Sequence, residues 1–185
     1  DEPVSKPEDF NNKKIRVMTN PLLSETYSAF GATPTPLPWG EVYGALQTNM
    51  IQGQENPIFW IESGGLYEVS PNLVFTSHGW FTTAMMANKN FYDGLSDEDK
   101  KLVEDAADYA FEKIIVHIDG LAEEALEKIQ KASDEVTVTR LNDEQIEAFK
   151  ARAPQVEEKF IEMTGESGKE LLNQFKEELK EVQSN

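Results

Sequence analysis

Three side chains in the first third of the sequence have the types that hold a small organic anion. Arg16 lies in the alternating stretch KIRV, Asn56 precedes Pro57 in GQENP, and Trp60 follows four residues after Asn56. A guanidinium binds a carboxylate through two parallel N–H groups, an asparagine amide both donates and accepts, and an indole offers a flat apolar surface. The combination predicts one wall of a cleft for a carboxylate-bearing ligand.

Trp39 and Glu41 lie between these residues, at the start of an expected helix. Each candidate also has an ordinary explanation. Arg16 could stand in solvent at a sheet edge or in a structural ion pair, the aromatics around Trp60 are typical of a core, and Glu41 suits the first turn of a helix because of the helix dipole. From the residues alone, both interpretations stay open. For Arg16 as a ligand clamp, we expect the guanidinium to face solvent when no ligand is bound.

Catalytic motifs are sparse. The sequence has no cysteine, and His78 and His117 are its two histidines. It contains no HxxxH, no GxSxG and no phosphate-binding glycine loop. A carboxylate pair formed by Glu41 and Glu55 supports only a weaker hydrolase hypothesis. A binding module is therefore favoured over an enzyme, and we expect no metal and no cofactor.

The net charge limits the kinds of molecule that the protein can bind. The formal net charge is −17, and residues 96–185 carry 24 acids against 12 bases, whereas residues 1–95 carry ten against five. Such a surface repels nucleic acid and anionic membranes. The acidity fits either a well-solvated protein or adaptation to high salt, where screening reduces self-repulsion. No apolar run approaches the length that spans a membrane.

The elements that would position the candidate residues follow from periodicity and capping. A strand is predicted around Ile15 and Val17, and a helix is predicted to begin after the N-cap Asn20 and end before Gly31, with Leu22, Thr26 and Phe30 on its buried face. The proline-rich TPTPLP is at most an edge strand. Further helices are predicted at 40–48, from Pro57, from Ser96 to about Ala132, from Asn142 with a kink at Pro154, and at 166–182; further strands are predicted at 73–76, at 81–87 and in EVTVTRL.

Several ordered motifs together resemble one family. KIRVMTNP, PTPLPWGEVYGALQT, GQENP and SHGWF…MMANKNFYDGLS are similar to stretches of the extracytoplasmic solute-binding proteins of TRAP transporters, and most of all to the ectoine- and hydroxyectoine-binding members. The resemblance implies an α/β fold of two lobes around a cleft: a mixed sheet flanked by helices, a long helix and acidic C-terminal helices. It implies that the first lobe is largely missing from this sequence.

By this resemblance, residues 1–72 form the ligand-binding segment of the second lobe, residues 73–95 cross towards the first lobe, and residues 96–185 form the long connecting helix and the C-terminal helices. Arg16 matches the arginine that pairs with the ligand carboxylate, Asn56 the asparagine that adds a polar contact, and Trp60 an aromatic wall. Trp39 and Glu41 lie near the pocket. Lys14 stands where ectoine-binding members commonly place an aromatic residue.

The function that the resemblance implies is capture of a small carboxylate or zwitterion, such as ectoine or hydroxyectoine, in the periplasm. The membrane subunits of a TRAP importer would receive the ligand. Two alternatives remain: a structural or assembly fragment that self-associates as a homo-oligomer, and a binding protein for another organic acid.

Overall fold

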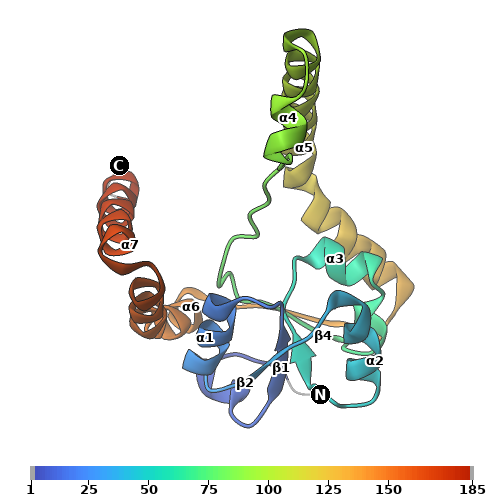
Figure 1. The fold of residues 1–185 in the computed structure, drawn as a ribbon. Coiled ribbons are helices and arrows are strands. Elements are labelled where there is room, and N and C mark those ends of the chain that lie inside the picture. Colours follow the sequence, from blue (N-terminus) through green and yellow to red (C-terminus); the bar gives the residue numbers. More distant parts are fainter. Residues whose placement is uncertain (1–2, 184–185) are drawn as a thin grey trace. The chain divides into compact units, whose positions relative to one another are not determined.

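The computed structural model describes residues 3–183 and confirms the α/β class (Figure 1). The chain divides into two compact units. The first unit comprises residues 1–55, 65–78 and 136–185, and the second comprises residues 56–64 and 79–135. None of the helices in the described part of the chain is both long and apolar enough to cross a membrane.

Two small parallel sheets lie in the first unit. In one, β1 (Lys14–Val17) pairs on one side with β2 (Thr33–Pro36) and on the other with β3 (Gly53–Gln54). In the other, β4 (Asn72–Phe75) pairs with β5 (Thr137–Arg140). The expected mixture of parallel and antiparallel pairs is wrong for these strands, because helices connect the members of each pair and such crossovers produce parallel strands.

The proline-rich strand β2 lies at the sheet edge, as predicted. Its position is compatible with Pro34 and Pro36, because proline has no N–H to donate to a second neighbour.

Helix α1 (Pro21–Ala29) begins after Asn20, whose side-chain oxygen accepts hydrogen bonds from the backbone N–H of Leu22 and Leu23. The predicted N-cap is confirmed, but the predicted buried face is only partly right. Tyr27 is buried, while Leu22 and Thr26 are half-buried. Tyr27 faces inward because it packs in an aromatic core. This core contains Phe10, Tyr27, Phe30 and Phe149, together with Ile15, Val17 and Leu141.

The remaining helices of the first unit also follow local signals. A 3-10 turn (Trp39–Glu41) leads into α2 (Val42–Gln47), and further 3-10 turns cover Pro7–Phe10 and Leu66–Glu68. Asn142 and Gln145 form the capping box of α6 (Asp143–Lys150). Helix α7 (Ala153–Gln183) contains Pro154 in its first turn rather than at a kink; the interruption is at Gly165, with φ 70° and ψ −155°.

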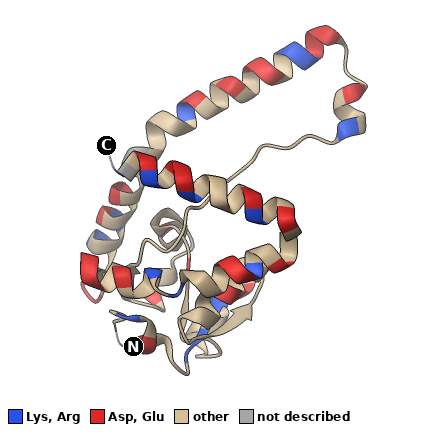
Figure 2. Ribbon diagram, turned by 90° about the vertical axis from the view of Figure 1, so that its left-hand side faces the viewer, with Lys and Arg blue, Asp and Glu red and all other residues tan. Residues whose placement is uncertain are grey.

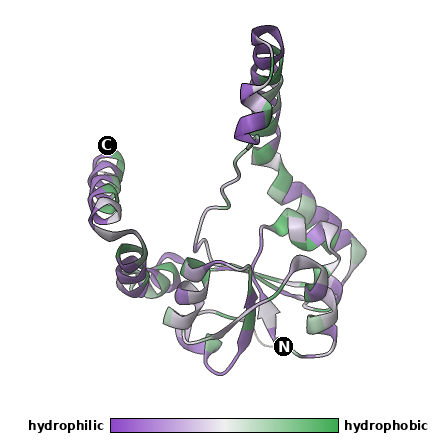
Figure 3. Cartoon of the chain, viewed as in Figure 1, coloured by the Kyte–Doolittle hydropathy of each residue, from purple (hydrophilic) through white to green (hydrophobic). Residues whose placement is uncertain are grey.

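The second unit contains α3 (Ile58–Ser63), α4 (Lys89–Asp93) and α5 (Asp97–Ala132). Ser96 caps α5 as predicted, and α3 packs against α5. Hydrophobic and hydrophilic residues alternate along α5 (Figure 3), and acidic residues recur on it with interspersed basic residues (Figure 2).

The strand predicted at 81–87 is wrong. Residues 79–88 have no regular secondary structure, and Trp80 is fully exposed. A strand needs a neighbour for its backbone hydrogen bonds, and within residues 3–183 this segment pairs with none.

Candidate functional site

Arg16 is the one charged residue in the buried core of the described chain, with 5% of its surface exposed. Its Nε and Nη2 groups both donate to the backbone carbonyl of Leu37, at 3.0 and 2.8 Å. The Trp39 ring centroid lies 6.0 Å from the guanidinium carbon. The expectation that the ligand-free guanidinium faces solvent is therefore wrong, because the Leu37 carbonyl holds it inside the unit.

The electrostatic environment of Arg16 has two opposing components. Burial lowers the pKa of Arg16, and the negative charge of Glu55 partly offsets this effect. An arginine nevertheless stays protonated in proteins. The site therefore contains a buried positive charge that donates to a neutral carbonyl, and its other N–H groups can donate hydrogen bonds to an anion.

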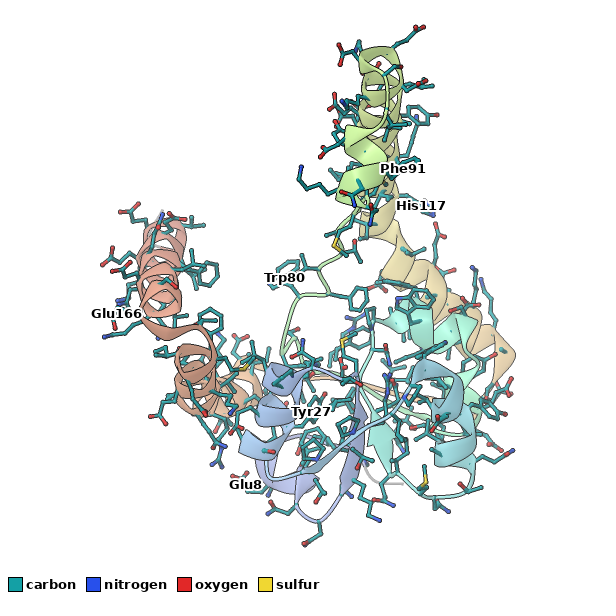
Figure 4. The ribbon with its side chains drawn as sticks, in the orientation of Figure 1. Glu8, Tyr27, Trp80, Phe91, His117 and Glu166 are labelled. Carbon is teal, nitrogen blue, oxygen red and sulfur yellow. The ribbon has the colours of Figure 1, made fainter. Side chains whose placement is uncertain are left out.

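Glu55 and His78 form a second part of the site. The His78 Nε2 atom lies 3.7 Å from Glu55 Oε2, and the His78 Nδ1 atom lies 2.6 Å from Thr76 Oγ1. The Tyr27 hydroxyl lies 3.5 Å from His78 Nε2, and the two rings meet edge to face at 5.5 Å. Tyr27 lies inside the first unit (Figure 4). Sequence reasoning did not connect these residues with Arg16.

A signal for this cluster was present in the sequence pattern. Leu37 follows β2, Glu55 follows β3, and Thr76 and His78 follow β4, so each lies just beyond the carboxyl end of a parallel strand. Ligands of open α/β sheets bind outside these ends. These strands belong to two separate sheets, and only the tertiary structure shows that their ends lie in one unit.

The other predicted site residues are divided between the first and the second unit. Trp39 and Glu41 lie in the 3-10 turn of the first unit, both exposed. Trp60 lies on α3 of the second unit, beside the Phe59 ring at 5.8 Å. Asn56 is the first residue of the same unit. The structure thus brings together Arg16 and Trp39; a contribution of Asn56, Trp60 and Glu41 to the same site remains a prediction.

Within residues 3–183, no group of three or more His, Cys, Asp or Glu side chains is arranged to hold a metal ion. The first unit offers a buried cation, Arg16, with polar neighbours, and this arrangement can bind an anion.

Helix-connected parallel strands with a buried arginine beside their carboxyl ends form an arrangement that can bind a small anion. The chain belongs to family 7 of the bacterial extracellular solute-binding proteins (DctP), whose sequence model matches residues 1–163. This finding confirms the family that the sequence motifs predicted.

Two relatives show which members of the family this chain is similar to. The ectoine-binding periplasmic protein TeaA of Halomonas elongata is 79% identical over 184 residues, covering 100% of this chain and 54% of the relative. The ectoine/5-hydroxyectoine-binding periplasmic protein UehA of Ruegeria pomeroyi is 56% identical over 177 residues, covering 96% and 52%. The chain thus spans about half the length of these relatives.

A solved structure shows the same arrangement. The periplasmic ectoine-binding protein of the TeaABC TRAP transporter from Halomonas elongata superposes with a TM-score of 0.93 at 79% identity. The match covers 97% of this chain and 59% of that structure. The fold is therefore that of TRAP solute-binding proteins, over the part that this chain spans.

Proposed function

We propose that this chain carries the arginine-centred part of a periplasmic solute site that captures ectoine or hydroxyectoine for a TRAP-type importer. The observation that carries the proposal is Arg16, a buried guanidinium bonded to the neutral carbonyl of Leu37. Burying a cation is costly unless an anion compensates it. A ligand carboxylate that meets the fork of the guanidinium would supply this compensation.

The choice of ligand rests on the relatives. Ectoine carries a carboxylate and a delocalised cationic ring, so it needs both a cation and an electron-rich surface. Arg16 would bind the carboxylate, and the Trp39 and Trp60 rings would contact the cationic ring. Asn56 would add a polar contact, and Glu41 would attract the ligand's positive end.

The proposed role includes no chemical change to the ligand. The bound solute would pass to the membrane subunits of the importer when the lobes open. The acidic surface would suit a saline habitat, because salt screens the repulsion between its carboxylates. No interaction with nucleic acid is proposed.

The test is calorimetric titration of ectoine, 5-hydroxyectoine and succinate into two proteins. One is the 185-residue chain, and the other is this chain joined to the part of the Halomonas elongata relative that the match leaves uncovered. We expect saturable binding of ectoine to the joined protein, with Arg16→Ala abolishing or greatly weakening it. Preference for succinate would favour a binding protein for another organic acid, and absence of binding to the joined protein would overturn the proposal.

A second candidate function is self-association as an assembly fragment. Helix α7 exposes apolar side chains at a spacing that places them on one face, namely Leu171, Phe175, Leu179 and Val182. Exposed apolar surface of this kind favours association. Sedimentation velocity of the chain alone distinguishes the two: a homo-oligomer that Phe175→Glu dissociates, without any ectoine binding by the joined protein, would favour this alternative.

A further inference from the structure

A cavity of about 190 Å³ lies inside the first unit, and none of the residues proposed to bind ectoine lines it. Helix α1, the segment after β4, helix α6 and the start of α7 form its walls, and all of these belong to the first unit. An engineered protein cavity of about 150 Å³ holds a benzene molecule. The cavity is therefore large enough for one six-membered ring with a small substituent.

Apolar side chains form much of the lining. Phe30 and Phe149 belong to the aromatic core, where their rings meet edge to face with centroids 5.0 Å apart, and both also line the cavity. Ile146 and Val156 add aliphatic surface. Aromatic rings attract one another in edge-to-face and offset arrangements, beyond the effect of buried area. Such a lining favours a ligand whose apolar part is an aromatic ring.

Two cations, Lys150 and Arg152, also line the cavity. Lys150 Nζ lies 2.7 Å from Glu147 Oε1, and Arg152 pairs with Glu8. The exposed fractions of these four side chains lie between 44% and 67%. Ion pairs in solvent contribute little to stability, because water screens them. Either cation can therefore turn from its glutamate to a carboxylate at the edge of the cavity.

The start of helix α7 adds to the positive charge at this place. Its first residue, Ala153, lines the cavity, and its first turn contains no acidic residue. The first turns of α5 and α6 contain three and two acidic residues. The N–H groups at the start of a helix carry partial positive charge, which favours a nearby anion. The cavity thus combines an apolar interior with a positively charged edge, in a chain whose formal net charge is −17.

We propose that this cavity is a second binding site, for a small aromatic monocarboxylate. The ring of the ligand would pack against Phe30, Phe149 and Val156, and its carboxylate would meet Lys150 beside the start of α7. The proposal goes beyond solute capture for an importer and does not depend on it, because the two sites share no proposed ligand-binding residue.

The test uses benzoate as the probe and benzyl alcohol as its uncharged match. Each is titrated into the isotope-labelled 185-residue chain, and the chemical shifts of the backbone amides report binding. Benzoate should saturate with a dissociation constant on the order of 1 mM, as expected for a ligand of this size, and should shift the amides of α6 and of the start of α7. Benzyl alcohol should bind at least about 3-fold more weakly. Equal affinity of the two probes would overturn the proposal.

Two substitutions locate the bound probe. Lys150→Gln should weaken benzoate binding about 3- to 10-fold and leave the affinity for benzyl alcohol unchanged, because it removes only the charge. Val156→Phe should fill the cavity and abolish binding of both probes. If Val156→Phe does not fold, Lys150→Gln and the positions of the shifted amides still decide. The control is Lys131→Gln, which removes the lysine of another exposed ion pair, with Glu127 on α5, and should change neither affinity.

The competing outcome is binding of benzoate at Arg16. In that case the shifted amides would surround β1, Lys150→Gln and Val156→Phe would leave the affinity unchanged, and the proposal would be overturned. A second measurement titrates ectoine into the joined protein with and without benzoate. The ectoine affinity should be the same in both, and competition between the two ligands would overturn the second site. Benzoate binding at the cavity without any ectoine binding would overturn the proposed function alone.

Discussion

The guanidinium of Arg16 donates two hydrogen bonds to the carbonyl of Leu37, which follows the neighbouring strand β2. Arg16 thereby fastens the segment before Trp39 to β1, and its side chain is part of the folded interior as well as a candidate ligand group. This double role changes what removal of the side chain should do.

We expect Arg16→Ala to lower both stability and affinity. Loss of the guanidinium leaves the Leu37 carbonyl without its donors, which should reduce the free energy of unfolding by about 1–3 kcal/mol. Affinity for ectoine should fall roughly 30-fold to several thousand-fold, since an emptied charge-assisted pair costs about 2–5 kcal/mol. Arg16→Lys should recover only part of either loss, because lysine keeps the charge without the fork. Urea unfolding and calorimetry measure the two effects.

Arg152→Ala is the matched control for this experiment. Its guanidinium pairs with Glu8 at the surface, with 44% of the side chain exposed, so its removal should cost at most about 1 kcal/mol. If Arg16→Ala leaves the ectoine affinity of the joined protein unchanged, the hypothesis that Arg16 binds the ligand carboxylate is wrong.

Lys14→Trp should strengthen ectoine binding. Lys14 is exposed and lies two residues before Arg16 on β1, so the two side chains leave the same face of the strand. An indole there could cover the cationic ring of the ligand, and a cation–π contact at an exposed site contributes about 0.5–1 kcal/mol. We expect a roughly 2- to 5-fold tighter dissociation constant by calorimetry. Lys13→Trp, just before the strand, should leave it unchanged; equal effects of both substitutions would count against the predicted geometry.

Tyr27 should make the protein sensitive to alkali. Burial, aided by the negative charge of Glu55, raises the pKa of Tyr27 well above its ordinary value of 10.0. Because the folded state keeps the phenol protonated, its contribution to stability is fully present below pH 10 and is lost as the pH rises above it. Tyr27→Phe should therefore show a smaller loss of unfolding free energy between pH 9 and 11 than wild type.

Tyr43→Phe serves as the control for that measurement. A hydrogen bond to Glu68 raises the pKa of Tyr43, but this tyrosine is solvent-accessible. Its removal should change the alkaline dependence much less than removal of Tyr27. An alkaline profile that is the same for Tyr27→Phe and wild type would contradict the prediction.

Two glycines should respond to alanine in opposite directions. Gly31 follows α1 with φ 97°, and a Cβ there would lie 2.2 Å from Asn11 Oδ1. Gly44 lies inside α2, and a Cβ there would meet nothing within 4 Å. Gly31→Ala should destabilise by about 1 kcal/mol or more, whereas Gly44→Ala should stabilise by about 0.5–1 kcal/mol. Urea unfolding measures the free energy of unfolding of both variants. An increase in this free energy for Gly31→Ala would contradict the prediction.

The sequence by itself determined the elements whose causes are local. The caps at Asn20, Ser96 and Asn142 were predicted because each side chain bonds to backbone within three residues of itself. The long amphipathic helix and the proline-restricted edge strand were predicted from periodicity and from the missing N–H of proline. The family was also evident in the sequence, because several motifs in a fixed order resembled it together, and the family model matches residues 1–163.

Tertiary structure decided the features that depend on a distant partner. Tyr27 is buried because Phe10 and Phe149 supply its packing. Residues 81–87 form no strand because no strand within residues 3–183 pairs with them. Arg16 meets a carbonyl 21 residues away, and Glu55 meets His78 across two sheets. Such contacts depend on which strands pair, and pairing is a cooperative property of the whole core. No local pattern in the sequence contains that information.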